Sequence, residues 1–322
     1  MSKVSVVIPV YGVEKYIERC ARSLFEQTLD DIEFIFIDDC TPDNSISILK
    51  EVLNEYPNRI KSTRIERMPK NSGLPAVRKY GVGLATGDYI IACDSDDYVD
   101  KEMYESMYKI ALKHNLDLVQ CDIEVVDDEK SLYILSSKKI RLSSNELKTL
   151  IINGDISNSL CNKLIKRSIY QNDELKFPVN NIDEDNATAV QLAYFSNNLT
   201  YIKKPYYKAY FNQSSMSREH GIEQITKQFE DSYANSQLII SFLQTHNYSN
   251  NSKAIITAKI RPKIILWAAV NNMKDIKKWK NVYPEINWKV ISDKRFPLGI
   301  RIKFLLTITY IYLIFKKFKI MQ

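Results

Sequence analysis

The strongest constraint on the fold is an alternation of short β-branched runs with helical patterns along the first part of the chain. This order implies βαβ units with right-handed crossovers and a largely parallel sheet. The first two runs are apolar nearly throughout, as expected for strands that are covered on both faces. Strands are predicted at residues 4–10, 32–37 and 89–93, and helices at residues 14–27, 45–56 and 74–85.

The patterns after residue 100 are weaker. They predict strands at 116–126 and 131–135, helices at 144–153 and 186–195, an extended segment at 199–211 and mostly helix from 221 to about 273. A chain of 322 residues is long enough for about two domains. We expect an α/β domain over residues 1–215, a helical region over 216–295 and a basic, apolar tail over 296–322.

Cysteine usage and charge restrict the environment and the partners. The 5 Cys are scattered without a C-x-x-C pair, which argues against a disulfide framework or a zinc site and favours a reducing compartment such as the cytoplasm. The first predicted strand follows Met1 with no signal-peptide pattern. From residue 289 onward there are eight basic residues and one acid, so this segment has a net charge of +7. Since the whole chain has a formal net charge of +6, the rest of the chain carries −1. A general nucleic-acid-binding surface is therefore not expected.

The strongest local signal is the acidic run Asp-Ser-Asp-Asp at residues 94–97, directly after a predicted strand. Parallel sheets bind ligands beyond the carboxyl ends of their strands. Three carboxylates in four residues repel one another unless a cation or a basic group neutralises them, and such hard oxygen ligands suit Mg²⁺ or Mn²⁺. In an extended segment Asp94 and Asp96 point the same way, so one can hold the metal while the other meets a ribose or a water. The alternative is an acidic N-cap cluster, which Asp100 alone could serve.

Other candidate residues have structural interpretations when taken alone. Asp38-Asp39 opens an ordinary turn, although a carboxylate there could accept the imide N–H of uracil. Glu184-Asp185 precedes a helix, where acids stabilise the helix dipole; the functional alternative is a general base. Among the isolated histidines only His220, near Arg218 in a polar stretch, is a candidate for the site.

Taken in order, these segments resemble family 2 glycosyltransferases. The resemblance rests on residues 4–11, 23–28, 37–39, 71–73, 87–90 and 94–97, and it continues in 161–167, 184–185 and 206–217, which resemble bacterial polysaccharide-assembly members. It implies a GT-A fold, that is, an α/β fold with a mixed, mostly parallel sheet flanked by helices, here with a helical C-terminal extension. It also implies an inverting transfer from a nucleoside-diphosphate sugar, often UDP-linked, with Mg²⁺ or Mn²⁺, to a glycan or lipid-linked saccharide acceptor.

The resemblance also implies roles for single residues. The nucleotide-binding set comprises Pro9, Tyr11, Asp39, Asn71 and Asp94. Asp94 and Asp96 form the D-x-D motif, with Asp96 as the metal ligand and Asp94 directed to the ribose or the metal. Asp185 is the catalytic base. An inactive nucleotide-sugar-binding or scaffold subunit remains an alternative, as does, with less resemblance, a sugar-phosphate nucleotidyltransferase.

The tail contains an almost wholly apolar run at residues 304–315. Its 12 residues are fewer than the ~20 needed to span a bilayer. We expect one of two arrangements: peripheral contact with the inner face of the cell membrane, aided by flanking Lys and Arg near anionic headgroups, or a C-terminal helix packed on its own domain.

Overall fold

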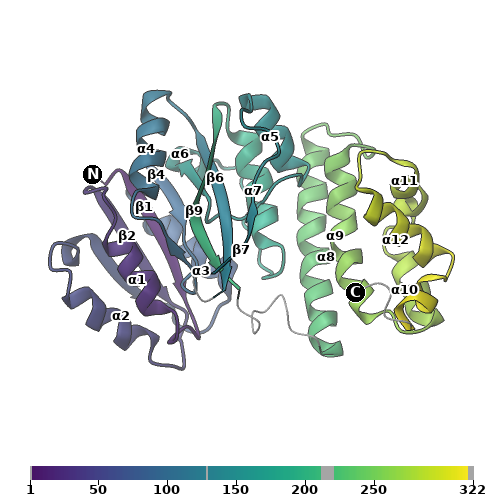
Figure 1. Ribbon diagram of the computed structural model, residues 1–322, viewed down its shortest axis with the longest axis horizontal. Helices are drawn as coiled ribbons and strands as arrows, with labels where there is room; N and C mark the ends of the chain where they lie inside the picture. The colour runs from purple at the N-terminus through teal and green to yellow at the C-terminus, as the bar shows by residue number, and fades with distance from the viewer. Residues whose placement is uncertain (1, 128–129, 212–220, 318–322) are drawn as a thin grey trace. The chain divides into compact units, whose positions relative to one another are not determined.

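The computed structural model describes residues 2–127, 130–211 and 221–317 (Figure 1). The chain divides into two compact units, Met1–Gln213 and Ser214–Gln322. The first is an α/β unit and the second is helical in its described part.

The first unit is built on one sheet, whose described part has nine strands. Its elements in chain order are β1 (Val4–Val10), α1 (Ile17–Phe25), β2 (Ile32–Asp38), α2 (Ser45–Asn54), η1 (Ile60–Ser62), β3 (Thr63–Arg67), α3 (Leu74–Leu84), β4 (Tyr89–Ala92), β5 (Tyr98–Val99), α4 (Met103–Lys113), β6 (Leu118–Asp127), β7 (Lys130–Leu135), α5 (Ser144–Ile152), β8 (Lys163–Lys166), α6 (Arg167–Tyr170), α7 (Glu184–Phe195) and β9 (Leu199–Tyr210).

The sheet is mixed and mostly parallel, which confirms the predicted fold class. The strand order is β3-β2-β1-β4-β8-β6-β9-β5, and β7 pairs with β6 off this path. Strands β3, β2, β1 and β4 run parallel to one another, and so do β6 and β9. Strands β8, β7 and β5 are antiparallel to the neighbours they pair with.

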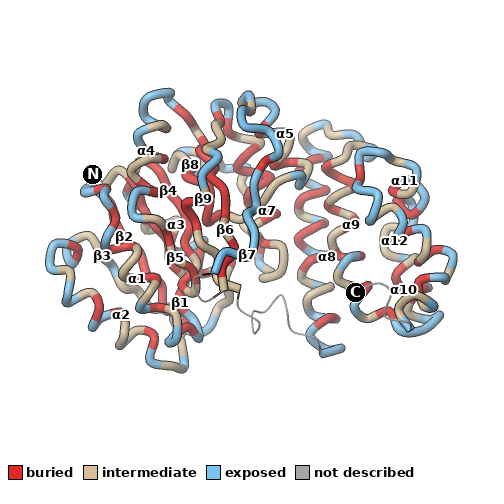
Figure 2. The backbone as a smooth tube through the Cα atoms, viewed as in Figure 1, coloured by how far each residue is buried: buried red, intermediate tan, exposed pale blue. Residues whose placement is uncertain are grey.

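The central strands are buried because helices cover them (Figure 2). Every residue of β2 is buried, and β1 is buried except for Pro9. Helix α3 approaches β1 so closely that a Cβ at Gly81 would lie 2.4 Å from Val7 Cγ1. Gly81 therefore sets the distance between α3 and the sheet, which positions the rest of this helix.

Helix α1 begins at Ile17, three residues later than the sequence predicts. The backbone N–H groups of residues 12–14 donate to the side chains of Thr41, Ser45 and Asp43. Because these donors are used outside the helix, the segment after β1 forms a loop tied to the loop after β2. The carboxyl ends of β1 and β2 are thus held together.

The second unit consists of helices around an aromatic core. The described elements are α8 (Ile222–Thr245), α9 (Lys253–Ala269), α10 (Met273–Asn281), η3 (Pro284–Ile286), α11 (Asn287–Ser292), α12 (Leu298–Ile308) and α13 (Tyr312–Lys317). Trp279 stacks on Trp267 at 5.6 Å between ring centroids, and Phe304 meets Trp279 edge-on at 4.9 Å. Among the described residues, no helix combines the length and hydrophobicity needed to cross a bilayer.

The apolar run in the tail is divided between α12 and α13, because the chain turns at Tyr310, whose φ is +64°. Phe304, Ile308 and Tyr312 are buried in the core of the second unit. Packing on the tail's own domain, one of the two predicted arrangements, therefore accounts for these residues. Other apolar side chains of the same helices stay exposed, including Ile302 and Leu305.

Candidate active site

Three of the acids singled out in the sequence meet at one buried arginine. Arg78 Nη2 lies 2.6 Å from Asp94 Oδ1, and Nη1 of the same guanidinium binds both Glu184 and Asp185. These pairs are separated by 16, 106 and 107 residues in the sequence, so the fold alone brings them together. The contact joins α3, the end of β4 and the first turn of α7.

The cluster carries more negative than positive charge. One guanidinium faces three carboxylates, and Arg78 is only 4% exposed. Burial lowers the pKa of Arg78, but Asp185 and Asp94 outweigh this and raise the pKa well above its ordinary value. Arg78 is therefore a fixed cation, and the remaining negative charge is available to a bound cation.

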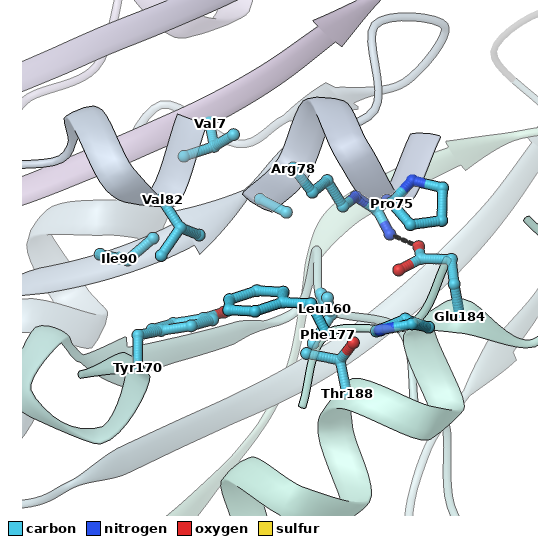
Figure 3. A pocket seen from close by; sticks show the side chains of 12 residues that line it. Val7, Pro75, Arg78, Val82, Ile90, Leu160, Tyr170, Phe177, Glu184 and Thr188 are labelled. Carbon is cyan, nitrogen blue, oxygen red and sulfur yellow. Dashed lines mark hydrogen bonds and ion pairs between the residues drawn. The ribbon is translucent and has the colours of Figure 1, made fainter. Parts of the chain in front are cut away.

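An apolar wall closes one side of this cluster. Arg78 and Glu184 line a cavity of about 20 Å³ together with Tyr170, Phe177 and other mostly apolar side chains (Figure 3). A cavity of this size has room for about one water molecule, so it cannot hold a sugar. A substrate must reach the cluster from the side where Asp94 and Asp185 keep 34% and 29% of their side chains exposed.

The acidic run after β4 divides into two kinds of residue. Asp97 is buried and accepts hydrogen bonds from the Tyr207 hydroxyl at 2.6 Å and the Tyr210 backbone N–H at 2.7 Å. Burial, and next the charges of Asp96 and Asp94, raise the pKa of Asp97 well above its usual range. Asp97 thus ties the loop to β9, while Asp94 and Asp96 remain partly exposed.

The two partly exposed acids, Asp94 and Asp96, have the chemistry of a divalent-cation site. In the described part of the chain, no group of three or more His, Cys, Asp or Glu side chains is arranged to hold a metal. Mg²⁺, however, is commonly bound by one or two carboxylates, with substrate phosphates and water completing the coordination. Asp94 and Asp96 fit that pattern, since both are carboxylates at the carboxyl end of β4.

The predicted nucleotide-binding residues lie at the neighbouring strand ends. Pro9 pairs with Ile37 in the register of β1 and β2, and Tyr11 follows β1 with 52% of its surface exposed. Asp39 is buried, and its two carboxylate oxygens accept the backbone N–H groups of Ser72 at 2.7 Å and Gly73 at 3.0 Å.

These two bonds hold the loop that contains Asn71 against the end of β2. Asn71 itself is exposed. Gly73 has φ +82°, a left-handed conformation that favours glycine, and its carbonyl accepts the N–H of Val77 in the first turn of α3. The Asp39 bonds therefore also fix where α3, and with it Arg78, begins.

Two buried cations near the acids were missed in the sequence. Arg78 lies within the helix predicted at residues 74–85, and nothing in the sequence singled it out. Lys163 lies fully buried on β8 and donates to the carbonyls of Ser157 and Ser159, both at 2.7 Å. Burial lowers the pKa of Lys163 to about 7, against the raising effect of Asp185. The sequence signal was weak: a lysine that follows Asn162 and precedes the apolar pair Leu164-Ile165.

His220, and residues 212–217 of the resemblance, lie outside the described residues. Their relation to the acidic cluster is therefore only a prediction. Tyr206 and Tyr207, from the same predicted segment, lie on β9, where the Tyr207 hydroxyl meets both Asp97 and the Asp94 backbone N–H.

Several known proteins that resemble this chain in sequence are named as glycosyltransferases. The sequence profile of glycosyl transferase family 2 matches residues 5–173. The putative glycosyltransferase EpsH of Bacillus subtilis (strain 168) is 31% identical over 251 residues, which cover 76% of this chain and 70% of EpsH. The poly(ribitol-phosphate) beta-glucosyltransferase of Bacillus spizizenii is 30% identical over 181 residues, 55% of this chain but only 27% of that longer protein.

Two solved structures resemble the chain in fold. Residues 1–349 of S. aureus TarS, crystallised with UDP-GlcNAc, match with a TM-score of 0.59 at 19% identity, over 85% of this chain and 83% of that one. The mannosyltransferase PcManGT of Pyrobaculum calidifontis, in complex with GDP-Man and Mn²⁺, matches with a TM-score of 0.55 at 13% identity, over 98% and 88%. These likenesses show the fold, which is the predicted GT-A fold. By its sequence match over more than half its length, the chain belongs to glycosyltransferase family 2.

Proposed function

We propose that this protein transfers a sugar from a nucleoside-diphosphate donor, a UDP-sugar, to a glycan or lipid-linked saccharide in bacterial surface polysaccharide synthesis. The observation that carries the proposal is the convergence of Asp94 and Asp185 on Arg78. Such a transfer needs one carboxylate beside the donor diphosphate and another on the acceptor side. Two partly exposed acids held by one cation meet that requirement.

The donor side is formed by Asp94 and Asp96. A Mg²⁺ or Mn²⁺ ion held by these carboxylates would stabilise the charge that grows on the diphosphate leaving group. Arg78 holds Asp94 in place at 2.6 Å, and the Tyr207 hydroxyl fixes the backbone of the same residue. The complex of PcManGT with Mn²⁺ and the complex of TarS with UDP-GlcNAc support a divalent cation and a UDP-sugar here.

The acceptor side is formed by Asp185. Its carboxylate takes the proton of the acceptor hydroxyl as the acceptor oxygen forms a bond with the anomeric carbon and the bond to the diphosphate breaks. Because a single displacement attacks from the face opposite the leaving group, the anomeric configuration inverts. Arg78 orients Asp185, and the buried Glu184 holds the guanidinium from its closed side.

The polysaccharide role rests on relatives. The family 2 match and the Bacillus relatives, one named as a glucosyltransferase acting on poly(ribitol phosphate), support an acceptor on a surface polymer. The alternative of an inactive binding subunit is disfavoured by the presence of Asp94, Asp96 and Asp185.

Donor hydrolysis tests the proposed activity. Purified protein is incubated with UDP- and GDP-sugars and Mn²⁺, and release of the nucleoside diphosphate is followed with and without EDTA. We expect metal-dependent release from at least one UDP-sugar. Full release in excess EDTA would contradict the metal role, whereas tight binding of UDP-sugar with no turnover on any glycan acceptor would favour the inactive subunit.

For localisation, we propose peripheral membrane contact through the second unit. Leu298, Ile302 and Leu305 are exposed on α12 at a spacing of four and three residues, which places them on one face. Basic residues are numerous in the tail, so this face fits an anionic bilayer. Replacing Ile302 and Leu305 by Ser should reduce cosedimentation with phosphatidylglycerol vesicles, whereas Leu112→Ser on α4, where the leucine is 65% exposed, should not. Equal sedimentation of all three proteins would refute the contact.

A further inference from the structure

A second hollow lies in the first unit, between the segment that follows β7, helix α5 and the loop that follows α5. It has two chambers, of about 620 Å³ and about 250 Å³, which share four lining residues: Ser136, Ser137, Asp155 and Ile156. The larger chamber is within the size range of small-molecule sites, roughly 300–1,000 Å³.

The floor of the smaller chamber holds an unsatisfied polar atom. Gln120 on β6 is 2% exposed, and its Nε2 donates to the Ser157 carbonyl at 3.3 Å. Its Oε1 is buried and has no hydrogen-bond partner in the described part of the chain. A buried acceptor without a donor costs free energy. A ligand that brings a hydroxyl donor to this chamber would recover that cost.

The wall beside Gln120 is already ordered by hydrogen bonds. Tyr201 on β9 lies opposite Gln120 in the strand register. The Tyr201 hydroxyl donates to Asp122, accepts the Ser137 N–H at 2.7 Å and lies 3.1 Å from Ser136 Oγ. These bonds fix the wall, and the serines that line the chamber, Ser136, Ser137 and Ser157, suit a ligand with many hydroxyls.

The charges around the hollow indicate a neutral ligand. The lining contains two lysines, Lys138 and Lys139, and two acids, Glu146 and Asp155. Lys139 Nζ lies 2.6 Å from Glu146 Oε1, so one of each sign is already paired. A phosphate-rich polymer or a nucleotide would need excess positive charge, which this lining does not offer.

A short loop connects the hollow to the Arg78 cluster. Ser157 lines the smaller chamber, Asn158 Nδ2 donates to Asn186 Oδ1 at 2.6 Å, and Cys161 Sγ lies 3.9 Å from Arg78 Nη2. The four residue steps from Ser157 to Cys161 span at most about 14 Å. Since Asn186 follows Asp185 directly, the hollow is held near the proposed base.

We propose that this hollow binds a neutral saccharide unit of the acceptor glycan, one or more units away from the hydroxyl that receives the sugar. Gln120 Oε1 accepts a hydrogen bond from a saccharide hydroxyl, and the serine side chains around it bind others. This proposal rests on the proposed transferase function, because it assigns part of the same acceptor. If the site binds as proposed, the distance between the hollow and Asp185 determines which acceptor glycans can be extended.

Saccharide binding to the full chain tests the site directly. Cellobiose, lactose and chitobiose are measured by saturation-transfer NMR in the presence of saturating UDP and Mn²⁺, which fill the donor site. We expect a signal from at least one of them. Thr149→Trp, which places a large ring in the larger chamber from an exposed position of α5, should weaken that binding by at least about tenfold. The matched control is Leu112→Trp, on the exposed face of α4.

A second variant separates ligand binding from folding. Gln120→Met keeps the length of the side chain and removes the unsatisfied acceptor, so it should weaken saccharide binding by roughly three- to tenfold while the thermal midpoint does not fall by more than a few degrees. The site is refuted if no saccharide binds, or if Thr149→Trp binds as well as Leu112→Trp. UDP titrations distinguish the two proposals: saccharide binding without UDP binding contradicts the donor assignment, and UDP binding without saccharide binding contradicts this site.

Discussion

The strands β2 and β4, which lie on either side of β1 in the sheet, both end in aspartates, and the two ends differ in what those aspartates do. After β2, Asp38 and Asp39 are both buried, and backbone N–H groups of Thr41, Ser72 and Gly73 occupy their oxygens. After β4, Asp94 and Asp96 remain partly exposed. The same residue type is therefore tied to a following loop at the β2 end, where that loop supplies N–H donors, and left partly exposed at the β4 end, where Arg78 supplies the charge.

The largest effect is expected from removing a carboxylate at the β4 end. Asp96→Ala should lower sugar transfer by about 10³-fold or more, because the charge on the leaving group loses its stabilising ligand set. The fold should survive, since Asp96 is only partly buried. Turnover and metal-assisted UDP affinity measure the loss. Asp100→Ala, which removes a partly exposed acid of the same segment that pairs with Lys208, is the control and should keep transfer; full transfer by Asp96→Ala would mean that the metal is held elsewhere.

The next effect concerns the acid on the acceptor side. Asp185→Asn keeps the shape of the side chain but cannot take a proton, so transfer should fall by roughly 10²- to 10⁴-fold while UDP–Mn²⁺ affinity changes little. Glu184→Gln should be milder, because Glu184 is buried against Arg78 and does not reach the exposed side. Calorimetric UDP affinity and acceptor-dependent turnover are measured on each variant. If Asp185→Asn turns over normally while Glu184→Gln is inactive, Glu184 is the catalytic base and Asp185 is not.

Among these variants, the largest loss of stability is expected from removing Arg78, the cation that pairs with Asp94 at the end of β4. Arg78→Met leaves the buried Glu184 carboxylate without its partner, which should cost about 3–5 kcal/mol in the free energy of unfolding. Urea unfolding measures this cost. Combining Arg78→Met with Glu184→Leu should restore part of the stability, since both charges are then gone. If the single variant is as stable as the wild type, the three-acid cluster does not hold the site together.

The sequence predicted the fold better than it predicted the connections within the site. Strands β1, β2 and β4 were predicted nearly to the residue, because each is a continuous apolar run in a covered part of the sheet. Strand β3 was missed because it lies at the sheet edge and none of its residues is fully buried. Strand β8 was missed because its four residues include the buried Lys163, which interrupts the apolar pattern.

The site shows the same division between local and long-range information. Asp94, Asp96 and Asp185 could be named from short segments in order along the chain, although their roles stay predictions. Arg78 could not be named, because an arginine in a helix carries no local mark of the acids that meet it 16 and 106 residues away. The division of Asp94–Asp97 into exposed and buried acids likewise depends on Tyr207 and Tyr210, more than 100 residues later.

The smallest effect is expected at the β2 end, where Asp39 has two proposed tasks. Asp39→Asn keeps one acceptor oxygen but turns an NH₂ group toward a backbone donor of the Ser72–Gly73 turn, so about 1–3 kcal/mol of unfolding free energy should be lost. If Asp39 also reads uracil through its remaining lone pairs, the same variant should lower the ratio of UDP affinity to ADP affinity. Loss of the base contact alone is worth roughly 0.5–1.5 kcal/mol, or a few-fold to about tenfold in that ratio.

Ser72→Ala, which leaves the backbone N–H to Asp39 in place, is the control for both measurements. An unchanged nucleotide ratio with reduced stability would make Asp39 a purely structural acid, and would extend the contrast between the two strand ends to every aspartate after β2.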